Sequence, residues 1–307
     1  MPHTHHDHHH HKIHLDTRLN TAFWVGIAIN LSFVIVEVLA GLFSGSLALL
    51  TDAGHNLSDV GSLGLSLLAF RLARIPGKGR LSYGYRKFTV LASLINALLL
   101  VVAVGVLGYE ATRRLAAPPV VPGLTVAMVA AAGIVVNTLS AWLFYRDREK
   151  DLNVKGAYLH LAADAAVSAG VVVSGLAMYY FNWTWLDPVV SYVVLAIIIW
   201  STWGLLKESV LLSLDAVPDE IEIEKIRNTA MKIGGVKDIH HIHVWAMSTR
   251  ENALTAHLVL EEGMPPGRSH DVKAAFRHEL EHMNIGHATL ETEGEQEVCG
   301  NPECQLS

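Results

Sequence analysis

The chain has 307 residues, of which 51% are hydrophobic and 17% are charged, so it is unusually apolar for a soluble protein of this length. The formal net charge of −6 argues against nucleic acid as a partner, and two cysteines are too few for a disulfide framework. Long apolar runs extend to about position 214, after which the chain becomes charged and mixed. This change predicts a membrane domain followed by a soluble domain.

Residues 1–20 are predicted to form a tail that is rich in histidine. Eight of the first 14 residues are histidine, and Thr4 and Asp7 interrupt the run. Such low-complexity tracts are typical of metal binding. A purification tag has a similar composition but an unbroken run, so we interpret the tract as native and expect it to gather metal loosely.

Residues 21–208 are predicted to form a membrane domain of six helices, each at least as long as the roughly 20 residues that cross a bilayer. No cleavable secretory signal is visible, because the first run is too long and no small-residue cleavage site follows it. The six segments are predicted at residues 21–42, 46–72, 87–109, 121–145, 156–181 and 187–206.

The basic residues predict the orientation of these helices. The loops after the second and fourth segments are rich in Lys and Arg, whereas the loops at 43–45 and 182–186 contain neither. Because positive residues remain on the cytosolic side, both termini are predicted to be cytosolic. The compact loops favour a bacterial inner membrane as the location.

Residues 209–294 are predicted to form a small cytosolic α+β domain. Helical segments at 218–233 and 268–283 and strands at 236–247, 253–261 and 285–293 give the order helix, strand, strand, helix, strand. This order predicts a sheet with both helices on one face. If the first hairpin is centred on Arg250, His243 lies opposite His257, close enough to share a metal ion, with His241 on the same face.

The last segment, residues 295–307, contains Cys299 and Cys304. In a reducing cytosol these side chains could bind a metal ion as thiolates. Two ligands do not close a site, so a partner from the histidine tract or from a second protomer would be required. An inert, frayed tail is the alternative.

Ionisable residues inside the apolar segments provide the strongest functional signal. The second segment contains His55 and Asp59 and the fifth contains His160 and Asp164, both as H-x-x-x-D. Residues four apart share a helix face, and the predicted orientation makes the two helices antiparallel, so the pairs can lie opposite each other. A carboxylate in the bilayer centre costs about 3 kcal/mol, which disfavours a purely structural role.

Two imidazoles and two carboxylates form a tetrahedral set that suits Zn²⁺. Mg²⁺ and Ca²⁺ prefer oxygen ligands, and Cu⁺ prefers sulfur.

His160 lies only a few residues into its apolar run, so we expect either an inner water-filled vestibule or a fifth helix that begins earlier, near Asp151. We interpret Asp52 as an outer-mouth residue near water, with a transient ligand or proton carrier as the alternative; Glu37 is a further polar exception.

Several stretches resemble the cation diffusion facilitator family in its zinc-exporting branch, namely residues 46–59, 83–98, 153–164, 186–188 and 236–245. The resemblance implies a homodimeric zinc/proton antiporter with six transmembrane helices and a ferredoxin-like cytosolic domain. It also implies three sets of residues: a transport site at His55, Asp59, His160 and Asp164; a cytosolic metal site at His243, His257, Glu291 and His270; and an interdomain charge pair of Lys87 and Asp215.

The predicted function is therefore Zn²⁺ export from the cytosol in exchange for protons, with no enzyme activity and with a second Zn²⁺ in the cytosolic domain. A transporter of the same fold for Fe²⁺, Co²⁺ or Cd²⁺ is the first alternative. A membrane-anchored zinc metalloprotease is a much weaker alternative. His278, Glu279 and His282 match the zinc-protease motif H-E-x-x-H, but the motif lies on a short polar helix of a small domain, which disfavours a protease active site. A membrane-anchored metal sensor is disfavoured, because an anchor has no use for buried carboxylates.

Overall fold

The computed structural model describes residues 17–145, 152–265 and 267–295. The predictions for the histidine tract and for Cys299 and Cys304 lie outside the described residues. Six long helices come first: α1 (Thr17–Ser44), α2 (Leu47–Ala73), α3 (Phe88–Ala116), α4 (Gly123–Tyr145), α5 (Leu152–Phe181) and α6 (Leu186–Ser213). They correspond in number and order to the six predicted segments.

Five of these helices, as far as they are described, are long and apolar enough to cross a membrane, and α2 is not among them. The first half of α2 carries Asp52, His55 and Asp59, and charged groups lower the hydropathy of a segment. Its 27 residues are nevertheless enough for a bilayer, which takes about 20. The polar residues of α2 are thus the ones that the sequence singles out for function.

The chain divides into two compact units. The first comprises the described residues up to Val60 and those of Ala103–Ile198, and the second comprises Gly61–Val102 and the described residues from Ile199 onward. Helices α2, α3 and α6 therefore contribute to both units. The domain boundary predicted at residue 208 falls inside the second unit.

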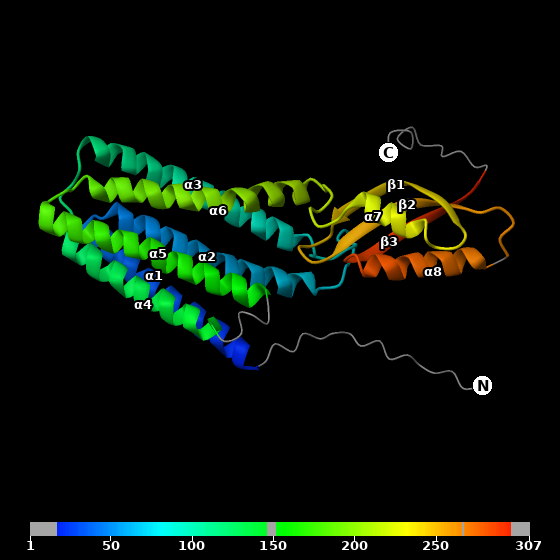
Figure 1. Cartoon of the computed structure of the whole chain (residues 1–307), viewed down its shortest axis with the longest axis horizontal. Helices are drawn as coiled ribbons and strands as arrows, with labels where there is room; N and C mark the ends of the chain where they lie inside the picture. The colour runs from blue at the N-terminus through cyan, green and yellow to red at the C-terminus, as the bar shows by residue number, and fades with distance from the viewer. Residues whose placement is uncertain (1–16, 146–151, 266, 296–307) are drawn as a thin grey trace. The chain divides into compact units, whose positions relative to one another are not determined.

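In the first unit, α4 packs against both α1 and α5 (Figure 1). The contact between α4 and α5 is close enough to depend on glycine: a Cβ atom at Gly175 would lie 2.8 Å from Gly123 O and 2.7 Å from Ala127 N. Small residues allow helix backbones to approach in this way inside a membrane. The tight α4–α5 pair thus fixes the position of α5, which carries His160 and Asp164.

The carboxylate of Asp187 fixes the beginning of α2. Asp187, at the start of α6, is fully buried. Its oxygens accept hydrogen bonds from Ser46 Oγ at 2.5 Å, Leu47 N at 2.7 Å and Ala48 N at 3.3 Å. The first N–H groups of a helix have no partner within that helix, and a carboxylate there also interacts favourably with the helix dipole. Asp187 therefore caps α2 from another helix.

The second unit contains the small α+β domain, with α7 (Ile223–Ala230), β1 (Val236–Ala246), β2 (Asn252–Leu260), α8 (Arg268–Glu281) and β3 (Ile285–Gly294). The strand order is β1-β2-β3, with β1 and β2 antiparallel and β2 and β3 parallel. Ile226 of α7 and Phe276 of α8 share one core with the sheet. The predicted order of elements and the helices on one face are confirmed. The first helix is shorter than predicted, because Pro218–Ile221 forms a turn.

The pairing predicted for β1 and β2 is wrong by two residues near the hairpin turn and by three residues beyond the bulge. His243 lies opposite Thr255, and His240 is the residue that lies opposite His257. The register shifts between His240 and His243, where His241 has a φ of 52°. Such a bulge inserts a residue into one strand and changes which side chains face each other. A hairpin centred on Arg250 with regular alternation is therefore excluded.

Lys87 and Asp215 lie together in the second unit, 2.5 Å apart between Nζ and Oδ1. Lys87 Nζ also donates to Leu212 O at 2.8 Å and to Ala246 O at 2.9 Å. One ammonium group thus connects the start of α3, the end of α6 and the end of β1.

Candidate metal sites

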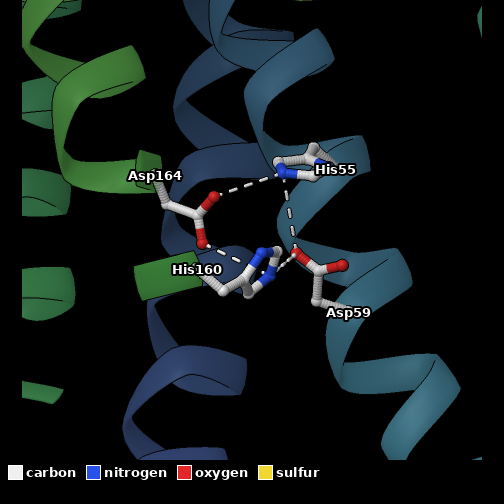
Figure 2. Close-up of side chains that lie close together, drawn as sticks. All are labelled: His55, Asp59, His160 and Asp164. Carbon is white, nitrogen blue, oxygen red and sulfur yellow. Dashed lines mark hydrogen bonds and ion pairs between the residues drawn. The ribbon is translucent and has the colours of Figure 1, made fainter. Parts of the chain in front are cut away.

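The first candidate site is formed by α2 and α5, which bring four predicted ligands together (Figure 2). His55 and Asp59 lie one turn apart on α2, as His160 and Asp164 do on α5. The helices are antiparallel, so His55 faces Asp164 and His160 faces Asp59. One ligand atom of each residue lies within 4.8 Å of every other.

The spacing of these atoms fits a tetrahedral ion. His55 Nε2 lies 3.3 Å from Asp164 Oδ1 and 3.7 Å from Asp59 Oδ2. His160 Nε2 lies 3.0 Å from Asp59 Oδ2 and 3.6 Å from Asp164 Oδ2. Zinc–ligand bonds of about 2.0–2.1 Å in a tetrahedron place neighbouring ligand atoms about 3.3 Å apart. The four side chains therefore need only small movements to coordinate one Zn²⁺.

The site is closed on one side and open on the other. The side chains of Asp164 and His55 are 6% and 12% exposed, whereas those of Asp59 and His160 are 33% and 48% exposed. The open side lies toward the C-terminal end of α2 and the N-terminal end of α5. Because α5 begins at Leu152, His160 lies two turns inside the helix, which agrees with the expected earlier start.

A second group of candidate ligands lies on the sheet of the α+β domain, with one residue from each strand: His240, His257 and Glu293. Glu293 Oε2 lies 3.2 Å from His240 Nε2, and Glu293 Oε1 lies 2.6 Å from His257 Nδ1. His240 Nε2 and Glu293 Oε2 are buried yet make no hydrogen bond. Buried polar atoms without a partner are costly, and a shared metal ion would satisfy both.

This group differs from the predicted cytosolic set, of which only His257 belongs to it. His243 Nε2 instead lies 3.1 Å from His241 Nε2, because the bulge turns it away from His257. Glu291 is at the exposed rim, 3.4 Å from His257 Nε2. His270 is exposed near the start of α8 and lies outside the group.

The sequence contained a signal for the residues that the prediction missed, His240 and Glu293. The buried apolar residues of β1 begin with Val236, Ile239 and Ile242, spaced by three rather than by two. A regular strand alternates with a period of two, so this spacing indicates irregular register. Placing the bulges there brings His240 opposite His257.

The interpretation of Asp52 as an outer-mouth residue near water is wrong. Its side chain is 1% exposed and accepts a hydrogen bond from Ser168 Oγ at 3.3 Å. Glu37, the further polar exception in the first apolar segment, is fully buried and accepts a hydrogen bond from Asn56 Nδ2 at 3.2 Å.

The protease-like motif on α8 has none of the surroundings of an active site. His278, Glu279 and His282 are all exposed. The two imidazole centroids lie 4.8 Å apart, but within the described residues no third ligand joins them in a metal-binding group.

Long apolar helices, an imidazole–carboxylate set inside them and an α+β domain with its own ligand group together define an integral membrane protein that handles metal cations. Two family models match the chain: "Cation efflux transmembrane domain" over residues 23–212 and "Cation efflux protein, cytoplasmic domain" over residues 218–294. The chain belongs to the cation efflux family, the cation diffusion facilitators.

Curated relatives cover nearly the whole chain. A protein of Escherichia coli (strain K12) named "Zinc transporter ZitB" is 35% identical over 306 residues, 98% of this chain and 96% of its own length. The protein of the same name from Pectobacterium atrosepticum is 35% identical over 98% of this chain and 92% of its own length. A Bacillus subtilis protein named "Cadmium, cobalt and zinc/H(+)-K(+) antiporter" is 34% identical over 86% of this chain and 85% of its own length.

Proposed function

We propose that this protein exports Zn²⁺ from the cytosol in exchange for protons. The observation that carries the proposal is the set His55, Asp59, His160 and Asp164, whose ligand atoms lie within 4.8 Å of one another inside apolar helices. The names of the relatives support the same substrate and the exchange with protons.

Zinc is the substrate that the ligand chemistry favours. Two imidazole nitrogens and two carboxylate oxygens at tetrahedral spacing suit Zn²⁺, which proteins commonly bind with four ligands in a tetrahedron. Fe²⁺, Co²⁺ and Cd²⁺ are the alternative cargoes, because imidazole also binds other divalent transition metals. The name of the Bacillus subtilis relative includes cadmium and cobalt.

Competition for the same lone pairs couples zinc to protons. An imidazole must be neutral, and a carboxylate ionised, to bind a metal ion. Free histidine loses its proton near pH 6.5, so acid on one side of the membrane displaces the ion and a higher pH on the other side favours its binding. Transport is therefore expected to slow as the pH on the zinc-loading side falls.

We further propose that the open side of the transport site faces the cytosol. The distribution of basic loops predicts cytosolic termini, which makes α2 run from outside to inside and α5 from inside to outside. The exposed ligands Asp59 and His160 then lie on the cytosolic side of the buried ligands His55 and Asp164. This arrangement corresponds to a state that is ready to load zinc from the cytosol, in a membrane proposed to be a bacterial inner membrane.

The cytosolic domain is proposed to bind a second Zn²⁺ and to form a homodimer. The donor set of His240, His257 and Glu293 fits such an ion, since it contains two imidazoles, a carboxylate and two buried atoms without hydrogen bonds. Glu291 lies close enough to be a fourth ligand. A structural zinc ion there would stabilise the folded domain. The match to the family's cytoplasmic dimer domain supports the homodimer.

Zinc uptake into proteoliposomes tests the transport proposal. The wild-type protein is expected to accumulate zinc when a pH gradient is imposed and to lose this accumulation when the gradient is collapsed. The double variant His55→Ala/Asp164→Ala is expected to show no uptake above empty liposomes. The matched control His278→Ala/Glu279→Gln, with both changes on the exposed face of α8, is expected to transport like the wild type. Uptake by the first variant, or uptake indifferent to pH, contradicts the proposal.

A further inference from the structure

Two buried carboxyl groups, Glu37 of α1 and Asp52 of α2, lie beside the transport site and have no part in the steps above. They are 0% and 1% exposed, and their side chains lie within hydrogen-bonding range of each other. The other groups that hydrogen-bond to them are neutral: Asn56 Nδ2 donates to Glu37 and Ser168 Oγ donates to Asp52. Within the part of the chain that the structure describes, no Lys or Arg forms an ion pair with either carboxyl.

Such surroundings do not accommodate two negative charges. Ionised carboxylates are acceptors only, and two of them at short distance in a medium of low dielectric constant cannot both remain ionised. No N–H or O–H group of the described residues reaches Glu37 Oε1. One proton held between the two carboxyls supplies the missing donor and removes one of the two charges.

The ionisable groups that act on this pair from the elements around it are ligands of the transport site. They are His55, three residues after Asp52 on α2, and Asp164 of α5. Three residues are almost one helical turn, a rise of about 4.5 Å. A divalent ion between His55 and Asp164 therefore acts on the pair electrostatically and favours its ionised form.

We infer that Glu37 and Asp52 form a proton-binding pair that releases its shared proton when zinc occupies the transport site and takes it up again when zinc leaves. The inference rests on the proposed function and assigns one of the exchanged protons to these two residues. On loading, the O–H bond of the shared acid breaks, the proton leaves to water, and the two positive charges of the ion offset the carboxylate that is formed. On unloading, a proton from the outer side restores the O–H bond.

Counting the protons released per bound zinc tests the inference on the purified full-length protein. Zinc is titrated into the protein in calorimetric experiments with two buffers of different ionisation enthalpy. Glu37→Gln and Asp52→Asn are each expected to release about one proton fewer per zinc than the wild type. The control Ser140→Ala, which removes another buried polar group of the membrane helices, is expected to keep the wild-type number. Wild-type numbers in both carboxyl variants overturn the inference.

Infrared difference spectroscopy tests whether Glu37 and Asp52 share a proton even if a variant no longer binds zinc. The zinc-free wild type is expected to show the C=O stretch of a protonated carboxyl group, and this band should be absent from both variants and should disappear from the wild type on addition of zinc. Persistence of the band in the variants, or its insensitivity to zinc, contradicts the inference. The proposed function is tested separately, because wild-type zinc uptake driven by a pH gradient does not depend on which residues carry the proton.

Discussion

The two groups of candidate metal ligands in this chain differ in how their side chains are buried. The group on α2 and α5 is buried at His55 and Asp164 and open at Asp59 and His160. On the sheet, the side chains of His240 and His257 are both 18% exposed and that of Glu293 is 10% exposed, so the enclosure is even. A site that releases its ion needs a path on one side, whereas a site that keeps its ion does not. The difference in burial fits the proposal that zinc is cargo in the membrane group and a resident ion in the group on the sheet.

The two groups also depend differently on the backbone. Each membrane helix supplies two ligands one turn apart, so helix geometry alone sets half of the site. In the sheet, each strand supplies one ligand of the group, and the bulge at His241 decides which histidine faces His257. Substitutions that separate the roles of the two groups therefore test this comparison most directly.

The largest effect is expected from Asp164→Asn in the membrane site. Asp164 is the most buried of the four ligands, and asparagine keeps its shape but removes the charge that offsets the ion. Loss of an outer-shell partner of a metal ligand typically costs 10–100-fold, so loss of a ligand is expected to lower the zinc transport rate by about 100-fold or more. The measurement is zinc uptake into proteoliposomes, with Asp238→Asn, an exposed carboxylate of β1, as the control.

Transport within about tenfold of the wild type in Asp164→Asn would show that the carboxylate is not a metal ligand, because a ligand contributes more than its outer-shell partners do. The proposal that the membrane group binds zinc as cargo would then be contradicted.

A smaller effect on transport is expected from His240→Ala and His257→Ala in the sheet. Each change removes an imidazole from the group and is expected to lower the zinc bound per chain by about one ion, because the remaining protein ligands, three at most with Glu291, no longer form the closed tetrahedral set of a structural zinc site. Transport is expected to fall only severalfold, since the membrane ligands are intact. Zinc per chain is counted by anomalous scattering at the zinc edge and by elemental analysis.

His243→Ala is the matched control for this experiment, because it removes a histidine of the same strand that lies opposite Thr255. It is expected to leave the number of bound zinc ions unchanged. If His243→Ala loses the ion and His240→Ala keeps it, His243, rather than His240, is the ligand from β1.

The membrane ligand set could be predicted from the sequence because its rule is local. A helix places residues four apart on one face, and charges are rare in apolar segments, so the two H-x-x-x-D motifs were conspicuous. The pairing between the motifs needed only the antiparallel direction of α2 and α5. The order of elements in the cytosolic domain was equally accessible from the periodicity of its apolar residues.

The group of His240, His257 and Glu293 could not be predicted with the same rule, because the register of a strand is not local. A shift of one residue in a strand exchanges its two faces, and the bulges of β1 shift its pairing along the strand. The burial of Glu37 and Asp52 was missed for another reason. Glu37 lies on α1, whereas its partner Asn56 lies on α2, and Asp52 of α2 is bonded by Ser168 of α5, so only contacts between helices bring these groups together.

The smallest effect is expected at Lys87, which lies in neither ligand group. Lys87→Met keeps the aliphatic part of the side chain but leaves Leu212 O and Ala246 O without their donor. Hydrogen bonds to charged groups contribute about 1.5–3 kcal/mol, and partial exposure reduces this, because water replaces part of the lost interaction. We expect a loss of about 1–2 kcal/mol in the free energy of unfolding, measured by denaturant titration of the full-length protein with circular dichroism.

Asp215→Asn distinguishes the two halves of this interaction. Asparagine retains an oxygen that accepts a hydrogen bond, and the Asp215 side chain is 62% exposed, so we expect a loss of at most about 1 kcal/mol. The two carbonyl oxygens keep Lys87 in place in this variant, including that of Leu212 near the end of α6, where the helix dipole favours a cation. If Asp215→Asn destabilises the protein more than Lys87→Met does, the charge pair rather than the carbonyl contacts holds the start of α3 against α6 and β1.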